Sequence, residues 1–146
     1  MHMMNKIKKP ENAFKWINKA LDNKDVVMGF GHRVYKSGDS RVPTMREYFS
    51  KVAKIKKDKK FEKIYDIVEK VMIDRKNIHP NVDYPTGPTY HLMGFDTDFF
   101  TPIFVISRIT GWSAHVLEQL STNKLIRPLA AYNGSKHRHV SELKNR

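Results

Sequence analysis

Apolar residues recur every three or four positions in four long segments of this chain, which is the spacing that lines one face of an α-helix. The segments run from Ala13 to Leu21, from Met45 to Ile55, from Phe61 to Met72 and from Ile103 to Val116. The alternation of apolar and polar residues that is typical of a β-strand is scarce, and no internal repeat is evident. The sequence therefore predicts an all-α fold.

Prolines and glycines indicate where these helices begin and end. Pro10 suits the first turn of the first helix, where no backbone N–H is needed, and the third helix must stop before Pro80. From Asn81 a turn-rich segment with two prolines leads into a short predicted helix at Tyr90–Met93. Gly94 is a natural terminator for that helix, because glycine adopts the left-handed backbone at low cost.

The most apolar segment runs from Phe99 to Leu120. We expect a helix there, with Thr101-Pro102 as its N-cap and first helical residue. Ionisable side chains interrupt the segment, at Arg108, His115 and Glu118. It is therefore a poor candidate for a membrane span, and the chain is expected to turn irregular beyond its end.

Composition restricts the class of protein further. The 146 residues, 40% of them hydrophobic, suffice for one folded unit with a core. Cysteine is absent, so disulfides and thiolate metal ligands are excluded, and without a visible signal peptide we expect a cytoplasmic protein. Met1–Met4 look like a foreign leader with a second start methionine, and we leave them out of the expected fold.

The net charge of +12 favours an anionic partner: a nucleic acid, an acidic membrane surface, or a phosphorylated or carboxylated small molecule. Charge alone does not choose among these. Much of the excess lies in a group of lysines that we interpret as a solvated helix face: Lys51, Lys54, Lys56, Lys57, Lys59, Lys60 and Lys63.

One glycine-rich segment, Gly29–Lys36, collects a histidine and cations within a short distance along the chain. Glycine on both sides of Phe30 permits positive φ angles and close approach of a ligand to the backbone. Together with Arg41, the segment could surround one bound anion. The alternative is an ordinary turn that carries a surface imidazole.

Four further motifs follow this loop in an informative order. Together with Gly29-Phe30-Gly31-His32 they resemble the C-terminal part of the citrate synthase family, which includes the 2-methylcitrate synthases. The resemblance extends from about Val26 to Gly134. The four motifs are Asn81-Val82-Asp83, Phe100-Thr101-Pro102-Ile103-Phe104, Ser107-Arg108-Ile109-Thr110-Gly111-Trp112 and Leu125-Ile126-Arg127-Pro128.

The resemblance implies a Claisen-type condensation of an acyl-CoA, acetyl- or propionyl-CoA, with oxaloacetate, followed by hydrolysis of the thioester. Asp83 matches the base that takes a proton from the carbon next to the thioester. His32 matches the histidine that polarises the keto carbonyl of oxaloacetate. Without the resemblance, Asp83 would be interpreted as a turn aspartate that bonds its own backbone.

Three arginines match the family's contacts to substrate carboxylates. Arg41 and Arg108 fall where the family clamps these groups, and Arg127 resembles an arginine that reaches into the other subunit's active site. The apolar helix around Arg108 favours a buried or liganded guanidinium over one that extends to solvent. Arg127 could equally be a loop cation.

The same loop resembles the segment that lines the coenzyme A site. The backbone of Gly29, Phe30 and Gly31 would line that site, and Arg33 and Lys36 are candidate phosphate contacts. The acyl-CoA is a co-substrate, and the resemblance implies neither a tightly bound cofactor nor a metal. The tail histidines, in His137-Arg138-His139, do not make a full set of metal ligands.

The resemblance also implies a division of the chain. Residues 6–94 would be the family's small, mobile domain, residues 98–132 the C-terminal large-domain helix with an active-site arm, and residues 133–146 a mobile tail. The expected partners are a second copy, as in the family's homodimer, or a separate large-domain chain. No membrane or nucleic-acid partner is expected.

Two departures from the family pattern stand out. Ser40 replaces the proline of the family's Asp-Pro-Arg motif, so the turn that aims Arg41 lacks proline's fixed φ. The family's enol-stabilising histidine, in a His-Gly motif, has no match here, since His2 lacks that context. We therefore expect this chain by itself to lack substantial synthase activity.

Two other classes of function stay open at this level. One is a non-catalytic interaction fragment that pairs with a separate large domain. The other is a basic helical module that binds nucleic acid, which charge alone supports, because aromatic residues are not interleaved with the lysines as stacking platforms.

Overall fold

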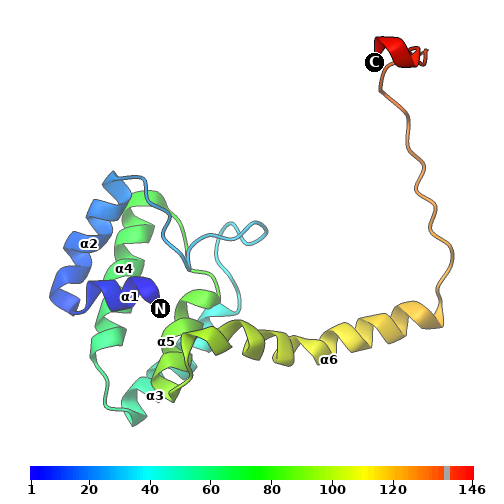
Figure 1. The fold of residues 1–146 in the computed structure, drawn as a ribbon. Coiled ribbons are helices and arrows are strands. Elements are labelled where there is room, and N and C mark those ends of the chain that lie inside the picture. Colours follow the sequence, from blue (N-terminus) through cyan, green and yellow to red (C-terminus); the bar gives the residue numbers. More distant parts are fainter. Residues whose placement is uncertain (137–138) are drawn as a thin grey trace. The chain divides into compact units, whose positions relative to one another are not determined.

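A computed structural model describes residues 1–136 and 139–146. The prediction of an all-α fold is confirmed, because the described residues contain helices and no strand, with one isolated bridge between Phe30 and Pro80 (Figure 1). The elements are α1 (His2–Ile7), α2 (Pro10–Asp22), α3 (Val42–Ile55), α4 (Lys60–Lys76), α5 (Asp83–Met93), the 3₁₀ turn η1 (Thr97–Phe99), α6 (Phe100–Ser121) and the 3₁₀ turn η2 (Leu143–Asn145).

The chain divides into two compact units, residues 1–108 and residues 109–146. In the first unit, α2 packs against α4, α1 contacts both, and α3 packs against α5 and α4. The second unit contains the end of α6, an irregular segment and η2. The prediction that regular structure stops near Leu120 is thereby confirmed for the described residues.

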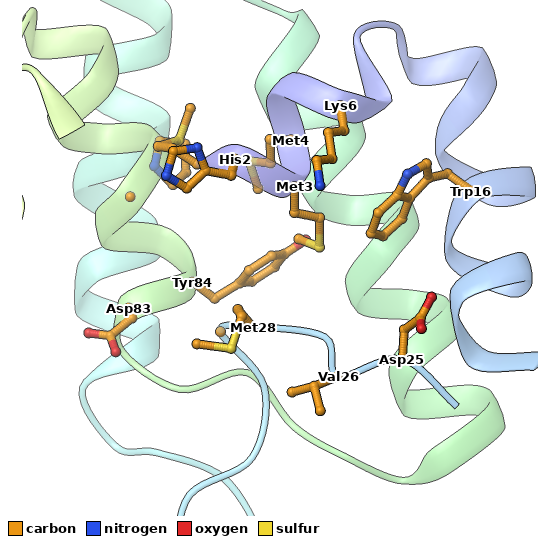
Figure 2. Close-up of a pocket in the computed structure, with 14 residues that line it drawn as sticks. His2, Met3, Met4, Lys6, Trp16, Asp25, Val26, Met28, Asp83 and Tyr84 are labelled. Carbon is orange, nitrogen blue, oxygen red and sulfur yellow. The ribbon is translucent and has the colours of Figure 1, made fainter. Parts of the chain in front are cut away.

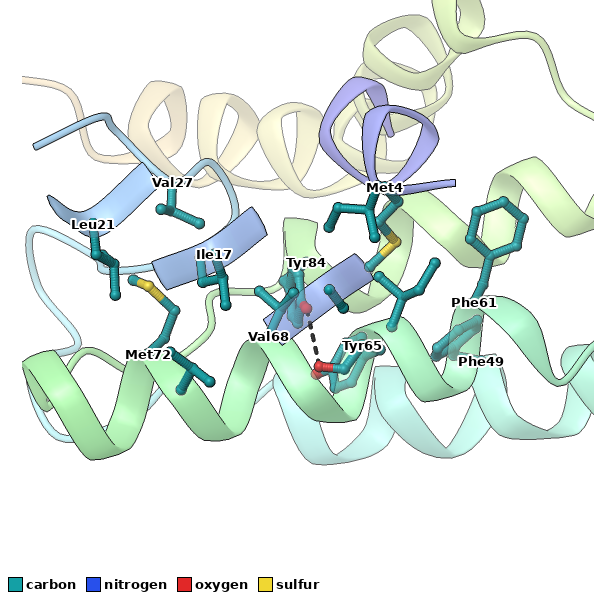
Figure 3. Close-up of a cluster of buried hydrophobic side chains, with 14 of the residues drawn as sticks. Met4, Ile17, Leu21, Val27, Phe49, Phe61, Tyr65, Val68, Met72 and Tyr84 are labelled. Atoms are coloured by element: carbon teal, nitrogen blue, oxygen red, sulfur yellow. Dashed lines mark hydrogen bonds between the residues drawn. The ribbon is translucent and has the colours of Figure 1, made fainter. Parts of the chain in front are cut away.

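The core of the first unit lies on α4. Its inward face carries Ile64, Tyr65, Val68 and Met72, at the three- and four-residue steps that the sequence predicts. Figure 3 shows Tyr65, Val68 and Met72 in the cluster with side chains of the neighbouring helices, among them Ile17, Leu21, Phe49 and Met4. Because the segments that form this cluster come from five helices, each helix is held by the others.

The interpretation of Met1–Met4 as a leader outside the fold is wrong. Residues His2–Ile7 form α1, and Met4 is only 2% exposed within the core. Ile7 is buried as well. The first helix therefore contributes two apolar side chains, a role that a short segment with a single turn of periodicity does not reveal.

The predicted apolar stripe of α3 is too wide. Of its members, Phe49 is buried, whereas Tyr48 and Ile55 are exposed. A narrow line through Phe49 and Ala53 makes the helix contact instead. The lysines between α3 and α4 are all exposed, which confirms their interpretation as a solvated surface.

The helix that ends at Gly94 is longer than predicted. It begins at Asp83, so the segment interpreted as a turn is helical and contains both Pro85 and Pro88. Pro85 lies in the first turn, where a missing N–H costs nothing, and both prolines are buried. Gly94 ends the helix at φ +94°, as the sequence predicts.

Helix α6 starts at Phe100, directly after η1, so Thr101 is inside the helix and is not its N-cap. Asp96 accepts the N–H of Asp98 and thereby caps the preceding 3₁₀ turn. No side chain of α6 is buried. Among the described residues, no helix is both long enough and apolar enough to span a membrane, as the sequence predicts.

Candidate functional site

The glycine-rich loop lies against the residues that precede α5. The N–H of Gly31 donates to the carbonyl of His79 at 2.8 Å, and the N–H of Asn81 donates to the carbonyl of Gly29 at 2.9 Å. The Asn81 side chain adds a bond from Nδ2 to the carbonyl of Gly31 at 2.9 Å. Two segments that are fifty residues apart in sequence are thus joined into one unit.

Both glycines of the loop have positive φ, at +92° for Gly29 and +76° for Gly31, as their position in the motif predicts. A Cβ on Gly29 would lie 2.9 Å from Cδ2 of Tyr84 and 3.2 Å from its Cα. Phe30 packs on the same tyrosine with ring centroids 4.4 Å apart. The loop therefore needs glycine at position 29 both for its backbone angle and for its contact with α5.

The imidazole of His32 is held by the backbone of its own loop. Its Nδ1 accepts the N–H of Val34 at 3.1 Å and that of Tyr35 at 3.2 Å. A nitrogen that accepts carries no proton, so the neutral ring has its hydrogen on Nε2. This arrangement leaves Nε2–H as a hydrogen-bond donor, which is the form suited to a carbonyl oxygen.

The rings of the loop connect His32 to Arg41. The His32 and Tyr35 rings lie 4.7 Å apart, and the guanidinium carbon of Arg41 lies 5.3 Å from the centre of the Tyr35 ring. A cation over an aromatic face is attracted by the ring's negative quadrupole. The candidate carbonyl donor and the candidate carboxylate clamp are therefore neighbours in the structure.

Asp39 is the buried partner of Arg41. One carboxylate oxygen accepts the backbone N–H of Arg41 at 3.0 Å and its Nε at 2.9 Å, and the other accepts Nη2 at 2.7 Å. These bonds hold the pKa of Asp39 well below its usual range, and the pairing raises the pKa of Arg41. Asp39 thus restrains the turn that Ser40 leaves without a proline.

Asp83 is the first residue of α5. Its N–H donates to Oδ1 of Asn81 at 3.1 Å, so the predicted turn interaction of this motif uses the aspartate's backbone and the asparagine's side chain. The Asp83 carboxylate itself is exposed, at the positive end of the helix dipole. In the described residues taken by themselves, Asp83 is therefore not the partly desolvated carboxylate that a carbon base needs.

A cavity of about 520 Å³ lies beside Asp83. Figure 2 shows Asp83 and Tyr84 on one side of it, Trp16 and Asp25 on the other, and Met28 between them. The first residues of the chain, including His2, also line it. A second cavity of about 280 Å³ also includes Asp83 and is lined by Phe100, Thr101 and Phe104.

Sequence reasoning missed the part of the cavity wall formed by Val26 and Met28. Both side chains are largely exposed, whereas Val27 between them is buried. The signal in the sequence was the run of three apolar residues, 26–28, directly before the glycine loop. Because side chains of an extended chain alternate between two sides, only the middle one can be buried while the two outer ones face the opposite side. The role of Trp16 was hidden by its place in the stripe of α2.

The other candidate cations lie in different surroundings. Arg33 and Lys36 are exposed in the loop. The guanidinium of Arg108 is exposed and lies 4.0 Å from the centre of the Phe104 ring. The expectation that its head group is buried is wrong for this chain, because α6 buries none of its side chains, and the alternative of a liganded head group stays a prediction. Arg127 belongs to the unit of residues 109–146 and is exposed there.

No metal site is found in the described part of the chain, where no three His, Asp or Glu side chains gather in a group that could hold an ion. Of the tail histidine cluster, His137 and Arg138 lie outside the described residues.

Comparison with known proteins identifies the family to which the chain belongs. The family model described as citrate synthase, C-terminal domain, matches residues 1–129. The chain is 53% identical to 2-methylcitrate synthase 2 of Corynebacterium glutamicum over 146 residues, all of this chain and 38% of that protein. It is 50% identical over 140 residues to a citrate synthase of Mycolicibacterium smegmatis, which is 96% of this chain and 37% of that protein. The chain thus spans less than two fifths of the length of these curated relatives.

Solved structures agree with the sequence comparison. The ternary complex of carboxymethyl coenzyme A and oxaloacetate with citrate synthase from Thermoplasma acidophilum matches with a TM-score of 0.76 and 35% identity, over 99% of this chain and 40% of that one. Citrate synthase from Thermotoga maritima matches with a TM-score of 0.74 and 34% identity, again over 99% and 40%. By sequence and by fold, the chain belongs to the citrate synthase family and corresponds to the C-terminal domain of its members.

Proposed function

We propose that this chain supplies one half of an active site that condenses an acyl-CoA with oxaloacetate, after which water hydrolyses the resulting thioester to give citrate or 2-methylcitrate and free coenzyme A. The observation that carries the proposal is the joining of His32, Arg41 and Asp83 on two bonded segments of one unit. The family membership and a structural neighbour whose complex contains carboxymethyl coenzyme A and oxaloacetate support it.

His32 acts on the keto carbonyl of oxaloacetate. Because its Nδ1 accepts two backbone N–H groups, the ring is held in place and Nε2–H is left as the donor for a ligand. As the new carbon–carbon bond forms, the carbonyl oxygen becomes an alkoxide, and a preorganised donor stabilises that charge by roughly 3 to 4 kcal/mol. The alkoxide then takes up a proton to become the hydroxyl of the product.

Arg41 binds a carboxylate of oxaloacetate. Its Nε and one hydrogen of Nη2 face Asp39, and the remaining N–H groups of the planar guanidinium lie on the opposite edge. The side chain is 41% exposed, so part of it is accessible to a ligand. Arg108 and Arg127 complete the carboxylate contacts, the latter from a second subunit.

Asp83 takes the proton from the carbon next to the thioester. Its side chain lines both cavities, at the point where a bound acyl group would lie between α5 and the loop. Gly29, Phe30 and Gly31 offer backbone to the coenzyme A moiety, and Arg33 and Lys36 are positioned in the same loop for its phosphates. No tightly bound cofactor is required for this chemistry.

The domain division and the partners are part of the proposal. Residues 6–94 would be the mobile small domain, residues 98–132 the large-domain helix and arm, and residues 133–146 a mobile tail. The exposed apolar side chains of α6, such as Ile106, Leu117 and Leu120, favour a covering partner, which is a large-domain segment or a second copy in a homodimer. The lack of cysteine favours a cytoplasmic location.

By itself the chain would have little activity. It spans 38% of its Corynebacterium glutamicum relative, and the Asp83 carboxylate is exposed to water. A catalytic set acts as a unit, so losing one wall of the site removes most of the rate. The choice between acetyl- and propionyl-CoA depends on about one methylene of pocket shape, worth ~1 to 3 kcal/mol.

The test is complementation. We would express the chain alone, and together with the part of the Corynebacterium glutamicum enzyme that precedes the matching region, and measure thiol release from acetyl- and propionyl-CoA. The expected result is release by the pair that depends on oxaloacetate, and little by the chain alone.

Variants then assign the roles within the assembled pair. His32→Ala should slow release by roughly 100- to 1000-fold, and Asp83→Asn should abolish most of it. Asp66→Asn, on the exposed surface of α4, is the matched control and should leave the rate unchanged. A pair that co-purifies yet releases no thiol would reject the proposed function.

A further inference from the structure

Asp39 has no role in the chemistry above, yet its carboxylate is the most fully bonded in the loop. Besides the three bonds from Arg41, its Oδ2 accepts the N–H of Val82 at 3.2 Å. The side chain is 1% exposed. A group so enclosed cannot touch a substrate, and its function must be exerted through the residues that it holds.

On one side Asp39 fixes the direction of Arg41. A guanidinium on a flexible side chain adopts many orientations. Binding a ligand carboxylate would restrict it to one of them, which costs conformational entropy. The paired bonds to Nε and Nη2 select one plane and leave the N–H groups of Nη1 outside the pair. The bond to the backbone N–H of Arg41 fixes the start of α3 at the same time.

On the other side Asp39 fixes the start of α5. Val82 immediately precedes Asp83 and has no polar side chain with which to cap this helix, while Asn81 accepts the N–H of Asp83. The Val82 N–H is a backbone donor at the helix start, where negative charge is favoured by the helix dipole. The carboxylate of Asp39 thus supplies, from a position 43 residues away in sequence, the acceptor for the Val82 N–H.

We propose that Asp39 is a positioning residue that holds Arg41 and Asp83 in a fixed relation, so that a carboxylate clamp and a carbon base act on one pair of bound substrates. The inference rests on the proposed function of those two residues. The role requires a carboxylate, because the four N–H donors divide between its two oxygens. An asparagine has a single acceptor oxygen: in place of Oδ2 it leaves the backbone N–H and Nε–H of Arg41 without this acceptor, and in place of Oδ1 it leaves Nη2 and the Val82 N–H without it.

The first test uses hydrogen exchange, measured by NMR on the 146-residue chain. In the wild type the Nε–H of Arg41 should exchange at least about tenfold more slowly than that of Arg33, an exposed arginine of the same loop. Equal exchange of the two would overturn the proposal without any variant. Asp39→Asn should then accelerate exchange at Arg41 Nε–H, at Val82 N–H, or at both, by a similar factor.

Asp66→Asn is the matched control, because it removes a carboxylate from another aspartate–arginine pair, the one with Arg46 at 2.8 Å. It should leave both exchange rates unchanged. A folded Asp39→Asn chain in which Arg41 and Val82 stay protected would overturn the proposal. If Asp39→Asn does not fold, the comparison of Arg41 with Arg33 in the wild type still decides it.

The second test separates positioning from general stability by titrating oxaloacetate into four folded proteins. These are the wild type, Asp39→Asn, Arg41→Ala and the double variant. Asp39→Asn should weaken binding by about tenfold when Arg41 is present, the size of one charge-assisted hydrogen bond, and by less than about twofold when it is absent.

Equal weakening in both backgrounds would show a merely structural role and overturn the proposal. No binding by the wild type would count against the proposed function of this chain. The exchange experiment would in that case still decide whether Asp39 joins the two segments, so the two failures are distinguishable.

Discussion

A methyl group added to Gly29 should destabilise the chain much more than the same methyl added to Gly94. The two glycines have almost identical φ angles, +92° and +94°. Their surroundings differ: a Cβ at position 29 would lie 2.9 Å from Tyr84, whereas a Cβ at position 94 would have nothing within 4 Å. The pair therefore separates the cost of the backbone angle from the cost of the clash.

The magnitudes follow from these two terms. An L-residue in the left-handed region costs about 1 to 2 kcal/mol, and alanine recovers about 0.4 to 1 kcal/mol by restricting the unfolded chain. Gly94→Ala should thus cost roughly 1 kcal/mol. At position 29 two of the three nearest atoms are the Cα and Cβ of Tyr84, which cannot rotate away, so overpacking adds about 1 to 3 kcal/mol.

Urea unfolding followed by far-UV circular dichroism measures both variants. We expect a free energy of unfolding lower by roughly 2 to 4 kcal/mol for Gly29→Ala, and a difference of at least about 1 kcal/mol between the two variants. Equal losses would refute the reasoning, because the tight packing of the loop on Tyr84 would then contribute nothing.

Three other outcomes are expected. Ile7→Ala should lower the free energy of unfolding by about 2 to 5 kcal/mol, because Ile7 is buried, whereas Phe14→Ala on the exposed side of α2 should change it little; similar values would place α1 outside the core. Tyr84→Phe should cost about 1 kcal/mol by removing the bond from its hydroxyl to the carbonyl of Tyr65, and an unchanged urea midpoint would contradict that bond. The pKa of Asp39 lies far below its ordinary value of 3.8, so the ionised carboxylate stabilises the fold fully above that pH, and this stabilisation is lost as the pH falls below it. The free energy of unfolding should therefore fall less steeply between about pH 5 and about pH 2 in Asp39→Asn than in the wild type, and parallel curves for the two proteins would argue against this.

The order of the helices could be predicted from the sequence, because the signals are local. Apolar spacing located α2 and α4, and Gly94 marked the end of α5. The start of α5 was missed, because two prolines normally indicate a turn and only burial against neighbouring helices makes their place in a helix favourable. Helix α1 was missed because six residues carry too little periodicity.

The candidate site was predictable as a set of residues but not as an arrangement. The residue types of the glycine loop and their order among the motifs were enough to suggest the family, and the comparisons confirm it. That Gly29 and Gly31 can adopt positive φ also follows from sequence, since glycine has no Cβ, but the fold decides which glycines do so, and Gly87 and Gly111 lie within helices without positive φ.

Only the tertiary structure decided how these groups are held. The tautomer of His32 depends on two N–H groups that the folded loop turns toward one nitrogen, and the bonds of Asp39 link residues 43 positions apart. Such contacts leave no periodic signal, because hydrogen-bond partners across a fold are fixed by the packing of α3 and α5 and not by spacing along the chain. The sequence by itself determined which groups are present, and the packing determined which of them face one another.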